Sequence, residues 1–289
     1  MSRNFSTSSH TPSAKRRRPR STIFIIFSIC IIILGMIFLS NRASDDPAKQ
    51  AAAHRIPLPD ACQLLQVITN PDLASLPLSY YAFDISFNPD THMPNWVAWE
   101  LTPTEVRTHR TSRRDNFRPD PDVNESALPA DYRNSGYDRG HIAPAADMKW
   151  DTLAMQQASL LTNICPQSHE LNQGAWNTLE NLTRQRVLRD SSLIIVAGPV
   201  LTLPPIDTIG PSRIPVPARY FKVILAPHAD PPFALGFIMD NSYIPGGLRS
   251  TLVSVDSVES LTGHDFFSAL PDSIEDIIES TTSHHHWRL

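Results

Sequence analysis

Proline is the feature that most restricts what this chain can fold into. The 289 residues include 26 prolines, spread along the whole length. Each proline fixes φ, removes a backbone hydrogen-bond donor and interrupts a helix interior or a central strand. A chain interrupted this often is a poor candidate for the long helices of a bundle. The sequence therefore favours a loop-rich α+β or mixed fold, and its length is sufficient for one large domain or two small ones.

An uncharged apolar run at 21–40 follows a basic segment at 1–20. Its length is near the roughly 20 residues that cross a bilayer as a helix. The preceding charges favour a cytoplasmic N-terminus and a transmembrane signal anchor, with the rest of the chain outside the cytoplasm, at the inner membrane facing a bacterial periplasm. A cleaved signal peptide is the first alternative. A mitochondrial presequence is the second, because the first 44 residues are rich in Ser and Arg and contain no acid.

Charge is distributed unevenly. Seven Lys or Arg precede Asp45, which leaves 18 basic against 29 acidic residues in the remaining chain. This balance argues against a general nucleic-acid binder, which usually has a broad basic surface, so any polyanion site must be a local basic patch. The stretch from Arg107 to Arg118, with five arginines and one acid, is such a patch or a solvated loop. Cys62 and Cys165 either form one disulfide in an oxidising compartment or stay free thiols.

The simplest division is a linker at 41–60, one domain at 61–275 and a polar C-terminal tail at 276–289, whose histidines are not expected to bind metal. We expect one helix at 172–189 and helical pieces within 254–280, interrupted at Gly263 and Pro271. Continuous apolar runs indicate buried strands. The expected strands are 78–87, 95–102, 192–200, 219–227 and 233–240.

Polar and aromatic residues recur every fourth position along the expected helix: Asn172, Trp176, Glu180 and Arg184. The plain interpretation is a helix cap followed by an i,i+4 ion pair between Glu180 and Arg184. A second interpretation joins this stripe to His141 in "DRGH". An amide oxygen and a carboxylate suit Mg²⁺, imidazole is a suitable general base near neutral pH, and arginines bind phosphate. Together they form a set for phosphodiester hydrolysis.

Several motifs now identify a resemblance: "RRDNFRPDPDV", "DYRNSGYDRGHIAPAADM", "LTNICPQ", "LNQGAWNTLENLTR", "IVAGPV" and "VESLTGHDFFSALPD". In this order they resemble the DNA/RNA non-specific endonucleases of the ββα-metal type, the family of Serratia nuclease and endonuclease G. The similarity runs from about Tyr80 to Asp272. It implies a ββα-metal nuclease fold, with a central antiparallel sheet flanked by helices.

The resemblance also implies roles for particular residues. His141 would be the general base, and Asn172 would be the direct ligand of Mg²⁺, for which Mn²⁺ could substitute. Glu180 would hold the metal through water, and Arg184 would contact the phosphate near the leaving group. Arg139 and Asn163 match positions that support the site and the substrate. Arg113, or Arg114 one place on, matches the upstream arginine that binds substrate. Asp138 is expected to brace the loop, and Gly140 to permit a close backbone approach.

The sequence therefore predicts an Mg²⁺-dependent endonuclease that hydrolyses both DNA and RNA by a one-metal mechanism. Two alternatives remain open: a catalytically silent nucleic-acid-binding or uptake protein, and a phosphodiesterase of a non-nucleic substrate. The mitochondrial intermembrane space is the alternative compartment to a membrane-anchored periplasmic one. The oligomeric state is open, a dimer included.

Overall fold

The computed structural model describes residues 58–113, 116–282 and 287. The basic segment 1–20, the apolar run 21–40 and nearly all of the linker 41–60 lie outside these ranges, so their assignments stay predictions. Within the described ranges, no helix combines the length and the apolar character needed to cross a bilayer.

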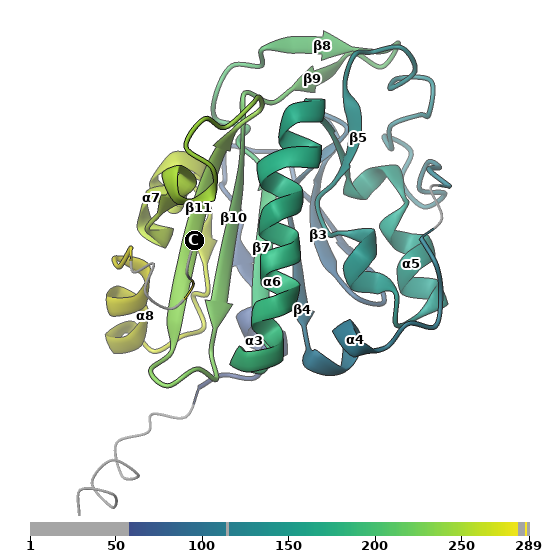
Figure 1. The fold of residues 1–289 in the computed structure, drawn as a ribbon. Helices are drawn as coiled ribbons and strands as arrows, with labels where there is room; N and C mark the ends of the chain where they lie inside the picture. The colour runs from purple at the N-terminus through teal and green to yellow at the C-terminus, as the bar shows by residue number, and fades with distance from the viewer. Residues whose placement is uncertain (1–57, 114–115, 283–286, 288–289) are drawn as a thin grey trace, which may run out of the picture. The chain divides into compact units, whose positions relative to one another are not determined.

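A seven-stranded sheet forms the centre of the described domain (Figure 1). All neighbouring strands in it run antiparallel. Their order is β12 (Leu252–Val253), β11 (Phe233–Asp240), β10 (Arg219–Ala226), β7 (Leu193–Pro199), β4 (Met93–Leu101), β3 (Asp84–Asn88) and β2 (Leu76–Ser79). The α+β class and the central antiparallel sheet are thereby confirmed.

The middle strands of this sheet are buried on both faces. Alternate residues of β7 belong to two separate apolar clusters, Ile195 to one and Ile194 to the other. The first cluster includes Leu179 and Val187 of α6 (Asn177–Asp190), and the second includes residues of α7 (Val255–Thr262) and α8 (Asp272–Glu279). Helices on both sides explain why these strands read as continuous apolar runs rather than alternating ones.

The single helix expected at 172–189 is corrected at its start. A wide-turned segment, η3 (Leu171–Trp176), precedes α6, and Gly174 within it has non-helical angles, φ −95° and ψ −111°. A glycine without Cβ accommodates this kink at little steric cost. Asn172 and Glu180 therefore do not lie on one continuous helix, although their spacing in multiples of four residues predicted that they would.

The helices of the C-terminal part are interrupted where the sequence predicted, at Gly263 and Pro271. α7 ends at Gly263 in the left-handed conformation, φ 73°, and α8 begins directly after Pro271. The expected boundary at 275/276 falls inside α8, whose Ile278 is buried against the sheet. Trp287 is also fully buried and its indole N–H donates to Asp190. Residues 276–279 and 287 are thus part of the packed domain, while His284–His286 lie outside the described residues.

Shorter elements complete the domain. They are α3 (Ala61–Leu64), β1 (Val67–Ile68), α4 (Pro103–Arg107), β5 (Asp138–His141), η1 (Ala145–Met148), α5 (Thr152–Ala158), η2 (Leu161–Asn163), β6 (Ile164–Gln167), β8 (Asp207–Ile209), β9 (Ile214–Val216), η4 (Leu248–Thr251) and β13 (Asp265–Phe266). Cys62 and Cys165 are both free thiols, which decides between the two alternatives for them.

Candidate active site

The hairpin-like pair β5–β6 places "DRGH" beside the helix. The two strands pair antiparallel, with His141, the last residue of β5, opposite Ile164 and Gly140 opposite Cys165. A Cβ added at Gly140 would lie 2.2 Å from Oε1 of Gln167, whose side chain is completely buried. Only glycine permits this approach without displacing Gln167, which confirms the expectation for Gly140. With η3 and α6 following, the chain forms a ββα arrangement.

One pocket collects six of the seven residues that the sequence assigned to the site. Its lining includes Arg113, Arg139, His141, Asn172, Glu180 and Arg184. These side chains come from the loop before β5, from β5 itself, from η3 and from α6. An imidazole, an amide, a carboxyl group and three guanidinium groups therefore share one small, polar pocket. Arg114, the alternative to Arg113, lies outside the described residues.

Asp138 fixes the orientation of the Asn172 amide. Nδ2 of Asn172 donates to Oδ2 of Asp138 at 2.9 Å. A carboxylate only accepts hydrogen bonds, so the nitrogen of the amide faces Asp138 and its oxygen is turned the other way. The same Oδ2 contacts the His169 ring at 3.0 Å. Asp138 thus contacts side chains of the segment before α6 as well as lying in β5, and it leaves Oδ1 of Asn172 turned away from itself.

Asn163 is the one assigned residue that does not line the pocket. It is fully buried in η2, and its amide bonds the backbone on both sides. Oδ1 accepts from the Ala143 N–H at 2.9 Å, and Nδ2 donates to the carbonyl oxygens of Ala143 and Ala158, each at 2.9 Å. Asn163 therefore clamps the segment that directly follows His141, and acts on the site through that backbone.

Two arginines of the pocket are held by neighbouring side chains. Nη1 of Arg184 donates to Oδ1 of the buried Asp147 at 2.7 Å, so Arg184 does not form the ion pair with Glu180 that helical spacing suggested. The guanidinium of Arg139 lies 5.4 Å from the ring centroid of Phe117, and that ring lies 5.2 Å from the His141 ring. Such contacts restrict where each group can point.

Glu180 faces a buried cation from the central sheet. Lys222 on β10 is 1% exposed, and its Nζ lies 4.1 Å from the ring centroid of Trp176. Burial raises the pKa of Glu180, and the nearby charges of Lys222 and Arg184 oppose that rise. Burial likewise lowers the pKa of Lys222, opposed chiefly by the charge of Glu180. Each group therefore favours the ionised form of the other.

Comparison with known proteins gives this geometry its context. The family model for DNA/RNA non-specific endonucleases matches residues 63–273. The chain belongs to this family. It is 34% identical over 212 residues to a nuclease from a Nostoc species, covering 68% of this chain and 75% of that protein. It is 33% identical over 208 residues to human mitochondrial endonuclease G, covering 67% of this chain and 69% of the relative.

A solved structure shows the same fold. The endonuclease in the crystal structure of the EndoG/EndoGI complex superposes with a TM-score of 0.65 at 26% sequence identity, over 74% of this chain and 94% of that one. The match to a mouse mitochondrial nuclease spans little more than half of that relative, 56% of its length. The family assignment and the nuclease class of the enzyme are thus confirmed.

Three residues of this family member's site went unassigned from sequence. Asp147 and Lys222 surround Glu180, and Phe117 lies between Arg139 and His141. A signal existed for one of them: Lys222 is the only charged residue in the apolar run 220–227. A lone lysine inside a strand buried on both faces must either be paired or mark a site.

Proposed function

We propose that this protein is an Mg²⁺-dependent, sugar-non-specific endonuclease that hydrolyses phosphodiester bonds of DNA and RNA, with His141 as general base. The observation that carries the proposal is the shared pocket of His141, Asn172, Glu180 and three arginines. Family membership and the named nuclease relatives support the reaction class. The ion and the mechanism rest on the chemistry of these side chains.

The donor set of the pocket fits a hard divalent cation. Oδ1 of Asn172 is turned away from Asp138, and the half-buried Glu180 supplies a second oxygen donor. Hard cations prefer such oxygen ligands, and Mg²⁺ usually keeps several waters. Asn172 would hold the ion directly and Glu180 through water. When bound, the ion supplies positive charge that stabilises the developing negative charge on the leaving oxygen.

His141 takes the proton of the attacking water in this mechanism. The ring is buried at the end of β5, and the following residues are clamped by Asn163, so the imidazole is held in a defined position. An imidazole near neutral pH accepts a proton readily, and a fixed position lowers the entropy cost of the transfer. Products with 5′-phosphates follow from cleavage at the 3′ oxygen.

Arg113, Arg139 and Arg184 would neutralise the scissile phosphate and its neighbours. Guanidinium groups bind phosphate oxygens in charge-assisted hydrogen bonds. Contacts to the backbone rather than to base edges carry no sequence information, which accounts for low base preference. Asp147 already holds the guanidinium of Arg184 in place, so Arg184 would stabilise the charge of the transition state without first changing its position.

The cellular location follows the relatives. Several are named as mitochondrial nucleases, from mouse, human and Saccharomyces cerevisiae. These names support the mitochondrial alternative for the location of this protein.

The test uses the full chain with plasmid DNA and total RNA, with Mg²⁺ or with a chelator. We expect metal-dependent loss of both substrates, abolished in His141→Ala and Asn172→Ala and retained in Arg219→Ala, whose exposed side chain pairs with Asp240 outside the pocket. Intact nucleic acid with folded protein would support the silent binding protein. Cleavage of only a non-nucleic phosphodiester would support the other alternative.

A further inference from the structure

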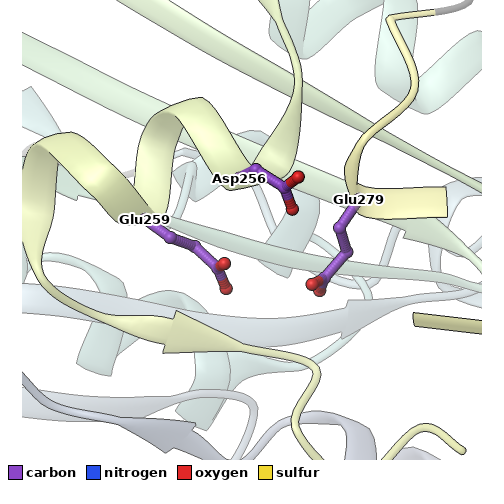
Figure 2. A group of neighbouring side chains, drawn as sticks. All are labelled: Asp256, Glu259 and Glu279. Atoms are coloured by element: carbon purple, nitrogen blue, oxygen red, sulfur yellow. The ribbon is translucent and has the colours of Figure 1, made fainter. Parts of the chain in front are cut away.

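A second group of acidic side chains lies far from the proposed active site in the fold. Asp256 and Glu259 on α7 and Glu279 at the end of α8 carry oxygens that all lie within 4.8 Å of one another. Figure 2 shows the three carboxylates turned toward the same space. Both helices belong to the apolar cluster on one face of the sheet, whereas α6 and the nuclease pocket lie on the other.

Glu279 is the unusual member of this group. Its side chain is 5% exposed, and among the described residues its Oε1 has no hydrogen-bond partner. A buried carboxylate oxygen without a partner is costly, since it has lost water and gained nothing in exchange. It points into a space that two further carboxylates share, so what is missing there is a positive charge.

The surrounding sequence supplies no such charge. Between Arg249 and Arg288 the chain contains seven Asp or Glu and no Lys or Arg. Burial raises the pKa of Glu279 to about 9, and the charges of Glu259 and Glu275 add to the rise. Burial is the main cause that raises the pKa of Glu259 to about 7. The hydrogen bond that Glu259 accepts from the Phe266 N–H opposes this rise. Burial and the neighbouring carboxyl groups therefore disfavour the ionised form of Glu279 as the protein stands.

We propose that Asp256, Glu259 and Glu279 form a structural Ca²⁺ site that joins α7 to α8. Three carboxylates from two helices supply the oxygen ligands that calcium prefers, and the exposed Asp256 leaves an opening for ion and water. The bound ion would satisfy Oε1 of Glu279 and favour the ionised form of its carboxyl group. It would thereby hold the last helix against the sheet, independently of nuclease turnover.

The spacing of the oxygens lies within the reach of Ca²⁺. Oxygens on Ca²⁺ lie about 2.3–2.6 Å from the ion, so two of them can be up to about 5 Å apart. On Mg²⁺, at about 2.0–2.1 Å, the limit is about 4 Å, and the required octahedron is more rigid. Ca²⁺ can therefore bridge any pair of these oxygens up to the 4.8 Å within which all three lie, whereas Mg²⁺ can bridge only the shorter separations.

The test is thermal unfolding of the full chain carrying Asn172→Ala, which removes the metal ligand proposed for the nuclease pocket. After chelation, Ca²⁺ at about 100 times its Kd should raise Tm by roughly 5–10 °C, and calorimetric titration should show one site. Adding Glu279→Gln should abolish both signals. Adding Asp276→Asn, a matched loss of an exposed carboxylate on the same helix, should leave both unchanged.

Three results would overturn the proposal. Folded protein without Ca²⁺ heat or Tm shift would mean that the carboxyl groups share protons instead of an ion. An undiminished shift in Glu279→Gln would place the ion elsewhere. Equal shifts with Mg²⁺ and Ca²⁺ would contradict the selection by size. None of these results bears on nuclease activity, which is measured separately in the chain with Asn172 intact.

Discussion

Asp138 accepts the amide N–H of Asn172, and this contact leads to the first prediction. In Asp138→Asn the partner can also donate, so the Asn172 amide is no longer held with its oxygen toward the pocket. We expect the Mg²⁺ concentration for half-maximal activity to rise about 10- to 100-fold, the usual effect of losing a group that orients a metal ligand. The measurement is nuclease rate against Mg²⁺ concentration. An unchanged metal dependence, with Asp276→Asn as control, would contradict the role.

Lys222 favours the ionised form of Glu180, and its removal should be visible in the pH profile. The pKa of Glu180 already lies above its ordinary value of 4.5, so activity that needs the carboxylate is lost as pH falls through this raised pKa. In Lys222→Met the pKa of Glu180 should rise further, and the acidic limb of the rate profile should move to higher pH.

The control for this shift is Lys149→Met, since Lys149 does not line the pocket. A loss of rate at every pH without movement of the limb would mean that Lys222 only fills space.

Sequence reasoning reached the pocket residues because "DRGH" and the helix motif are local patterns that occur in the order typical of the family. The pairing of Lys222 with Glu180 escaped it for a physical reason. Which face of β10 meets α6 depends on strand order and register, and these are long-range properties that no local pattern encodes. Asn163 was found, but its bonds to Ala143 and Ala158 show that it supports the site from behind.

At the scale of elements, the close contact of β5 and β6 gives a further prediction. Gly140→Ala places a methyl group against the buried Gln167, which should destabilise the hairpin by about 1–3 kcal/mol. Denaturant unfolding measures this loss. Gln167→Ala removes the obstacle, so the double variant should be more stable than the two separate losses predict. Strict additivity would show that the two residues do not meet.

The hydrogen bonds of Asn163 predict that its loss affects the stability of the protein, whereas the loss of Asn172 affects activity. Asn163→Ala leaves buried backbone groups of Ala143 and Ala158 without partners, and should cost about 1–3 kcal/mol. For a domain of this size that is roughly 2–12 °C in Tm. Asn172→Ala, by contrast, should abolish activity with little change in Tm. Thermal unfolding and rate measured on both variants check the distinction, and an unchanged Tm in Asn163→Ala would refute the clamp.

The kink at Gly174 shows where local patterns stop being sufficient. The stripe from Asn172 to Arg184 predicted one straight helix, and an ideal helix places Glu180 about 12 Å beyond Asn172 along its axis. The real chain changes direction between them, and both side chains line one pocket. The buried strands β7, β10 and β11 were easier to predict, because a continuous apolar run of that length is typical of a strand covered on both faces.

For the whole molecule, a local cationic pocket on an acidic chain predicts strong salt dependence. If three arginines meet phosphates, substrate binding should weaken on the order of 10- to 50-fold between about 50 and 200 mM salt. Binding of DNA to His141→Ala, measured at several salt concentrations, gives the slope. Arg113→Ala should reduce that slope by about one, and Arg219→Ala should not. Equal slopes would remove Arg113 from the phosphate contacts.

Because the sheet is buried on both faces, a shift in the register of one strand should be strongly destabilising. Along β10, Lys222 faces α6, while Phe221 and Val223 face the apolar cluster beneath α7. A shift of one residue in strand register would exchange these faces, bringing a charged group into the apolar side and leaving Glu180 opposite a hydrocarbon. The buried lysine that favours the ionised form of Glu180 therefore also distinguishes the correct strand register from a shifted one, and we expect a chain with the shifted register to be unstable.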